Sequence, residues 1–199
     1  TMGIRHAKDG QSLVDTQEGA LQEVTALLQR MRELAVQAGS GVATNTDKNY
    51  LQVEMGHLVD EIDAISDSTK FNDQRVLTGA TFAFYTDIDV AGTAVTTVAA
   101  SAAAATIGIT KANVSIGAGT STNALLQAVI TKVDSAIGSI ASFRANLGAV
   151  SNRFDHLIDG LTNVVANTEA SKSRILDTDF SIETTQLTRN TVLQQAATS

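Results

Sequence analysis

Residues 126–175 carry the strongest structural signal in the chain and read LQAVITKVDSAIGSIASFRANLGAVSNRFDHLIDGLTNVVANTEASKSRI. Apolar or small side chains recur every three or four residues, which is the period of one face of an α-helix. They are Leu126, Val129, Val133, Ile137, Ile140, Leu147, Val150, Phe154, Leu157, Ile158, Leu161, Val164, Val165, Thr168 and Ile175. With a start near Thr122, the pattern predicts a helix of about 54 residues, on the order of 80 Å long. One small globule cannot enclose such a helix, so the predicted molecule is a rod.

The apolar pattern is predicted to break near the end of the chain. Residues 177–179, Asp-Thr-Asp, interrupt it and can cap another helix, expected from Phe180 to about Ala197. Its apolar side chains, such as Leu187 and Leu193, have little chain left to cover them. Because the sequence also begins inside a helix-like pattern, both of its ends are expected to be cut from a longer protein.

Two shorter helices are predicted before the long one. The first runs to about Gly39, where glycine can adopt the left-handed conformation that ends helices. The second begins near Asp47, which is expected to cap it, and ends at residues 67–69. The first stripe comprises Leu13, Val14, Ala20, Leu21, Val24, Leu27, Leu28, Met31, Leu34 and Ala35, and the second Leu51, Met55, Leu58, Ile62 and Ile65. The expected fold is mainly α: an elongated antiparallel bundle of two N-terminal helices and one very long C-terminal helix.

A change in composition divides the chain into three parts. Residues 1–79 and 122–199 are predicted to form the two halves of the helical rod. Residues 80–121 contain few charges and mostly Thr, Ala, Val and Gly, so they are predicted to be a small insertion. Just before it, residues 70–79 are rich in turn formers.

The insertion is predicted to contain one or two β-hairpins. Residues 81–84 and 114–116 alternate as half-buried strands do. Turns are expected at residues 91–93 and 117–119, and a short helix is an alternative for residues 99–105.

The overall composition excludes several classes of protein. The 199 residues are 43% hydrophobic and 18% charged, so the chain is expected to fold. It has no Cys, which excludes disulfides and thiolate metal sites, and no Pro to break long helices. With a net charge of −7 and no basic patch, a nucleic-acid binder is not expected. No membrane span or signal peptide is expected either.

The sequence contains no arrangement that argues for catalysis. His6, His57 and His156 lie far apart and in no metal-ligand spacing, so surface roles are expected for them. No phosphate loop, nucleophile elbow or HExxH motif occurs. No enzyme activity, cofactor or metal is therefore predicted.

One flank of the first helix is a candidate contact surface. Gln29, Arg30 and Arg32 lie beside the apolar stripe, and Leu34 lies one turn after Arg30. Arginine mixed with apolar side chains on a rigid helix is common in protein–protein contacts. The simpler interpretation is a solvated flank with a weak Arg30–Glu33 ion pair.

Several segments of the chain resemble bacterial flagellins. The segment LQRMRELAVQ at residues 28–37 is similar to a flagellin signature. Further similar segments lie at residues 9–20, 61–66, 69–72, 144–154, 171–180 and 192–196. The resemblance covers about residues 1–79 and 122–199, whereas residues 80–121 do not match.

The resemblance implies a structural subunit of the bacterial flagellar filament. Flagellins assemble with other flagellin subunits through their rod helices, and an export chaperone and a filament cap are further expected partners. The implied location is extracellular, on the flagellum, after secretion through the export channel. The extreme terminal segments of flagellins are expected to be missing from this sequence.

The resemblance also implies a role for the flank of the first helix. In many flagellins the matching region binds the flagellin-sensing Toll-like receptor of animal hosts. The matching positions are Gln29, Arg30, Leu34 and Glu54. They are therefore candidate receptor or inter-subunit contacts.

Three alternative functions compete with that of a filament subunit. One is the hook–filament junction protein, which shares the terminal helices of flagellins. Another is a surface-displayed binding protein that uses residues 80–121 as a ligand module. The third, an enzyme carried in the insertion, is opposed by the absence of an HExxH motif.

Overall fold

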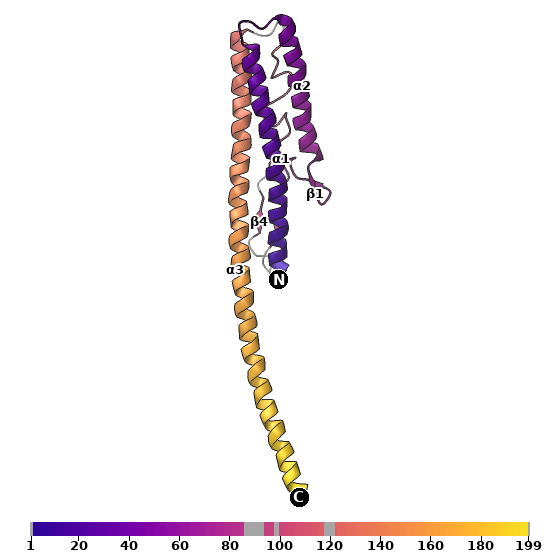
Figure 1. Ribbon diagram of the computed structural model, residues 1–199, viewed down its shortest axis with the longest axis vertical. Helices are drawn as coiled ribbons and strands as arrows, with labels where there is room; N and C mark the ends of the chain where they lie inside the picture. Colours follow the sequence, from indigo (N-terminus) through magenta and orange to yellow (C-terminus); the bar gives the residue numbers. More distant parts are fainter. Residues whose placement is uncertain (1, 86–93, 98–99, 118–121, 199) are drawn as a thin grey trace.

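The molecule is an elongated rod of three helices in a computed structural model that describes residues 2–85, 94–97, 100–117 and 122–198 (Figure 1). Helix α1 spans Met2–Ala38, α2 spans Asn45–Ser68 and α3 spans Asn123–Thr198. The helices α1 and α2 lie along the first part of α3, and the rest of α3 extends alone beyond the start of α1. The predicted mainly-α, rod-like bundle is confirmed.

Helices α1 and α3 are antiparallel and share most of the core. Gly10 of α1 lies against Phe154 of α3, and Gly39, just after α1, lies near Leu126. Fully or almost fully buried side chains on α1 include Leu13, Leu21, Leu28, Met31 and Leu34, and on α3 Leu126, Val129, Val133, Ile140, Leu147 and Phe154. These positions belong to the predicted stripes, so the periodicity identified the faces that pack together.

Two ion pairs bridge α1 and α3 at the edges of this core. Arg144 Nη2 lies 2.7 Å from Glu18 Oε1, and Arg32 Nε lies 2.8 Å from Asp134 Oδ1. Both pairs are partly exposed, so they contribute less to stability than the apolar core. Their positions are consistent with the antiparallel register of the two helices.

The predicted break at residues 177–179 is wrong. Helix α3 continues through these residues and runs for 76 residues, about 114 Å at 1.5 Å per residue. Asp and Thr have only modestly low helix propensity, so three such residues do not end a helix that contains no Pro or Gly nearby. The apolar stripe still packs against the core at Leu157 and Ile158, but farther along α3 it is exposed, with Val164 at 60% and Ile175 at 66%.

By length and composition alone, α3 contains a stretch apolar enough to cross a membrane. Length and apolar composition do not distinguish a membrane span from a helix in the core of a bundle. Val129, Val133 and Ile140 of α3 are buried in the core of the bundle.

Helix α2 starts at a capping box, and its cap differs from the predicted one. Thr44, not Asp47, is the N-cap: its hydroxyl accepts a hydrogen bond from the Asp47 backbone N–H at 3.2 Å. Asp47 returns the interaction, since its Oδ2 accepts from the Thr44 backbone N–H at 2.9 Å. The threonine fits the cap because its backbone is extended, with φ −75° and ψ 165°.

A short hairpin follows α2, where the sequence indicated only turns. Strands β1 (Lys70–Phe71) and β2 (Gln74–Arg75) are antiparallel. The turn between them places Asn72 and Asp73 at φ 49° and 62°, a conformation that Asn and Asp tolerate better than most residues.

The chain after this hairpin is held against the rod by buried polar side chains. Gln17 of α1 donates to the Val76 carbonyl at 2.6 Å, and Ser66 of α2 donates to the Leu77 carbonyl at 3.0 Å. Val76 and Leu77 are both fully buried. They therefore anchor this segment to the core of the rod.

The predicted insertion contains one described hairpin and an extended segment. Strands β3 (Ala83–Phe84) and β4 (Val95–Thr96) are antiparallel, which agrees with the strand predicted at residues 81–84. Residues 114–116 form no strand, and residues 100–105, the described part of the alternative helix at 99–105, contain no helix. The predicted turn at residues 91–93 and most of that at 117–119 lie outside the described residues.

The extended segment belongs to the same core as the helices. Its buried side chains are Ala100, Ala102, Ala104, Ile107, Ile109, Val114 and Ile116. Side chains of α2 accept hydrogen bonds from its backbone: Asp63 Oδ1 from Ala104 N–H at 2.8 Å, and Gln52 Oε1 from Ile116 N–H at 2.5 Å. The second part of residues 80–121 is therefore laid along α2 rather than set apart from the rod.

Candidate partner-binding site

The predicted contact residues meet where α1 and α2 pack side by side. Arg30 of α1 and Glu54 of α2 form a two-pronged ion pair, with Nε and Nη2 at 2.8 and 2.7 Å from Glu54 Oε1. Arg30 Nη1 also lies 3.1 Å from Glu33 Oε2, so the predicted Arg30–Glu33 pair is present. The hydrogen bonds to Glu54 and then Glu33 raise the pKa of Arg30, so its guanidinium is always charged. One cation is thus shared by two carboxylates.

The other two predicted contact residues are not equivalent. Gln29 is exposed on the outer side of α1. Leu34 is fully buried, so its side chain is part of the core and not of the surface. The apolar stripe already included Leu34, and this burial is what a stripe position predicts.

A pocket of about 340 Å³ lies farther along the same two helices, at the end of the rod. It is lined by Gln37, Ser40, Val42, Ala43, Asp47, Tyr50 and Leu51. Val42 and Tyr50 are strongly exposed, at 89% and 71%. Neither residue was predicted as a contact residue from the sequence. The available signal was that both side chains are apolar but lie outside the helical stripes.

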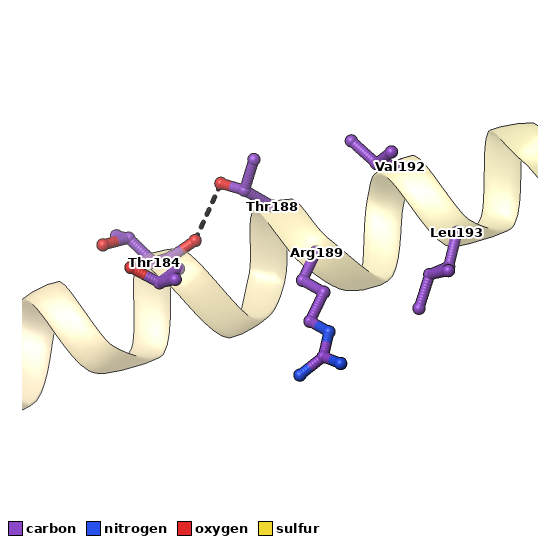
Figure 2. A pocket seen from close by; sticks show the side chains of 6 residues that line it. Thr184, Thr188, Arg189, Val192 and Leu193 are labelled. Atoms are coloured by element: carbon purple, nitrogen blue, oxygen red, sulfur yellow. Dashed lines mark hydrogen bonds between the residues drawn. The ribbon is translucent and has the colours of Figure 1, made fainter.

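The unpaired end of α3 presents a second exposed surface. Its large apolar side chains Ile175, Leu176, Phe180, Ile182, Leu187, Val192 and Leu193 are all more than half exposed. Figure 2 shows Arg189 and Leu193 on one side of the helix, with Thr188 bonded to the carbonyl of Thr184 at 2.8 Å. A single helix has no opposing wall, so this surface can bind only a partner that supplies the other half of the packing.

The described residues hold no group of His, Asp and Glu side chains that could bind a metal ion. His6 Nδ1 lies 2.8 Å from the Tyr85 carbonyl oxygen, and its ring therefore contacts the start of the insertion.

Comparison with known proteins gives a consistent result at both ends of the chain. A family described as "Bacterial flagellin N-terminal helical region" matches residues 1–81, and one described as "Bacterial flagellin C-terminal helical region" matches residues 130–199. A flagellin of Clostridium tyrobutyricum is 48% identical over 75 residues, which are 38% of this chain and 20% of that protein. This chain spans about a fifth to a quarter of the length of the curated relatives that it matches.

Solved structures share the fold. The crystal structure of Bacillus cereus flagellin has a TM-score of 0.64 and 32% identity, covering 82% of this chain and 94% of that one. A putative flagellar hook-associated protein from Vibrio parahaemolyticus has a TM-score of 0.71, covering 85% of this chain and 88% of that one. At 13% identity, the second likeness concerns the fold alone.

Proposed function

Because the chain belongs to the bacterial flagellin family, we propose that it is part of a structural subunit of the flagellar filament. In this proposal the subunit leaves the cell through the flagellar export channel and assembles with further flagellin subunits. An export chaperone and a filament cap are its other partners. Residues 1–79 and 122–199 form the two halves of the rod, and residues 80–121 are the segment that varies between flagellins.

The exposed apolar stripe of α3 is the observation that carries this proposal. A helix with so many large apolar side chains in water gains free energy when other helices cover them. Subunits that stack through such faces form contacts that do not close, and therefore propagate as a filament. The absence of Cys and Pro suits a subunit that refolds outside the cell, because no disulfide or Xaa-Pro isomerisation delays it.

A polymerisation assay on the full natural protein tests this role. Replacing two of the exposed apolar side chains, Leu187→Ser with Leu193→Ser, is expected to abolish filaments seen by sedimentation and electron microscopy. The polar substitution Gln186→Ser in the same helix is the matched control and should leave filaments intact. Filaments of normal yield from the double variant would contradict the proposal.

Receptor recognition is a second candidate function for the surface around Arg30. It is favoured by the charged side chain Arg30, held in place by Glu54 of the neighbouring helix, beside exposed Gln29. In this role Leu34 packs in the core on the inner face of α1 and does not contact the receptor. Arg30→Ala is expected to weaken activation of cells that carry the flagellin-sensing Toll-like receptor, and an unchanged dose response would refute this role.

Two other roles remain as alternatives, one structural and one in ligand binding. A hook–filament junction protein has the same fold, but the family matches and the 32% identity to Bacillus cereus flagellin favour a filament subunit. A surface-displayed binding protein would bind a polysaccharide or peptide through residues 80–121. Loss of such binding after changes in that segment, with filaments unaffected, would favour this role.

A further inference from the structure

Residues 76–79, which directly follow the β1–β2 hairpin, form a junction between distant parts of the chain. The Leu77 carbonyl accepts two hydrogen bonds there, one from the Ser66 hydroxyl of α2 at 3.0 Å and one from the Ala102 backbone N–H at 3.1 Å. Leu77 itself is fully buried. One buried carbonyl group therefore joins α2 to the extended segment, residues 100–117.

Backbone pairing continues this connection beyond Leu77. The Gly79 N–H donates to the Ala100 carbonyl at 3.1 Å, and Thr78 pairs with Ser101 in an antiparallel bridge. Gly79 has a φ of 86°, which glycine adopts without strain. The end of the hairpin segment, residues 70–79, is thus bonded along its backbone to the start of the extended segment.

Gln17 of α1 holds the junction from the side of the core. Its side chain is fully buried, and its Nε2 donates to the Val76 carbonyl at 2.6 Å. Its Oε1 is buried as well and accepts no hydrogen bond from the part of the chain that the structure describes. A buried oxygen without a donor costs free energy, which is recovered when the junction opens to water. Gln17 therefore positions Val76 by a specific bond and at the same time lowers the cost of opening.

The two segments that meet at the junction have little stability of their own. Strands β1 and β2 contain two residues each, and such a short hairpin does not persist alone in water. The extended segment contains no helix, and α2 holds its backbone, for example where Asp63 Oδ1 accepts from the Ala104 N–H at 2.8 Å. Segments of this kind open as cooperative units while the helical core stays folded.

We propose that Gln17 holds the hairpin segment and the extended segment together as one unit, which opens and closes as a whole while the rod of α1 and α3 stays folded. Opening separates Val76 from Gln17 and Leu77 from Ser66, and it frees the side of α2 that carries Asp63. The inference depends neither on filament assembly nor on receptor recognition.

Hydrogen–deuterium exchange of the monomeric chain, followed by mass spectrometry, tests the proposal. Gln17→Glu keeps the shape of the side chain but replaces the amide donor by a carboxyl group that is costly to bury. Exchange is expected to become about tenfold faster or more in the hairpin segment, and faster by the same factor in the extended segment. Gln22→Glu, at an exposed position of the same helix, is the matched control and should change exchange by less than about twofold.

A second variant tests the connection from the other end. Asp63→Ala removes the acceptor of the Ala104 N–H and is expected to speed exchange at least about threefold, in the hairpin segment as much as in the extended segment. Glu61→Ala, at another exposed acidic position of α2, is its control and should leave both segments unchanged. Because this variant leaves the core intact, it decides the question alone if Gln17→Glu does not fold.

Three results would overturn the inference. Faster exchange in only one of the two segments would show that they open independently. Unchanged exchange in Gln17→Glu would show that Gln17 does not hold the unit. Exchange of both segments at the rate of residues 129–147 in the unchanged chain would show that they open only when the rod unfolds.

Discussion

At the scale of single residues, Gly10 marks a close approach of α1 and α3. The Phe154 ring lies directly on its backbone and is fully buried. The same ring contacts Phe84 of β3 edge to face, with 5.7 Å between ring centroids. A residue without a side chain thus lets one aromatic ring join α1, α3 and the insertion.

Gly10→Ala is expected to destabilise the fold by about 1–3 kcal/mol, because the ring must move to admit the new Cβ. That Cβ would lie 2.8 and 2.9 Å from the two Cε atoms of Phe154. Gly19→Ala on the same helix is the matched control, since its Cβ would meet no atom within 4 Å. The control should stabilise the protein by about 0.5–1 kcal/mol. Urea unfolding followed by circular dichroism measures both, and equal midpoints would contradict the close approach.

Asp47 predicts a pH dependence at the start of α2. Hydrogen bonds from the Thr44 side chain and backbone hold its pKa below its ordinary value of 3.8. A carboxyl with a lowered pKa stabilises the folded state above its ordinary pKa, and this contribution is lost as pH falls through the lowered value. As pH is lowered from about 5 to about 2, the midpoint temperature of thermal unfolding should therefore fall more steeply for the natural chain than for Asp47→Asn. Parallel curves for the two proteins would show that the capping box does not respond to pH.

At the scale of elements, α3 is one helix with two environments. Ile140 in its first half is fully buried, whereas Ile175 in its second half is 66% exposed. Both positions fit the same stripe, so periodicity alone assigns them the same role. The difference arises because contacts with the core reach Leu157 and Ile158, whereas the far end of α3 extends alone beyond the start of α1.

The two isoleucines should therefore respond differently to the same truncation. Ile140→Ala is expected to cost about 2–5 kcal/mol, because it removes buried methyl groups and leaves a cavity. Ile175→Ala should change the stability of the isolated chain by less than about 0.5 kcal/mol. Chemical denaturation of the isolated chain gives both values. A comparable loss at both positions would mean that the end of α3 is packed in the monomer.

At the scale of the whole molecule, the rod was predictable because the apolar pattern that produces it lies within each helix. Leucine, isoleucine and valine at steps of three and four identify the buried faces of α1 and α3 without any knowledge of their partner. The continuity of α3 through residues 177–179 was not predictable, since it depends on a small balance of helix propensity. The placement of residues 100–117 along α2 was missed for another reason. Their backbone is held by Gln52 and Asp63, which are far away in sequence.

The candidate site was predictable only in part, for the same reason. The pairing of Arg30 with Glu33 follows from helical spacing. Its pairing with Glu54 spans 24 residues and was not predicted, since the family resemblance named Glu54 only as a candidate contact position. The pocket at Val42 and Tyr50 depends on where the turn after α1 lies, and no periodic pattern describes a turn. Sequence patterns thus identify the faces of helices, whereas sites between elements require the assembled structure.

The uneven packing of the rod leads to a prediction about its motion. Residues 129–147 of α3 lie against α1, so their amides exchange with solvent only through large-scale opening. Residues 180–198 lie in the exposed part of α3, and an isolated helix opens easily in water. In the isolated chain, hydrogen–deuterium exchange followed by mass spectrometry should be at least about a hundredfold faster for residues 180–198. In assembled filaments of the full protein the difference should shrink, because neighbouring helices then cover Leu187 and Leu193. Equal protection of both segments in the isolated chain would show that α3 needs no partner, and would remove the main physical reason for assembly through its end.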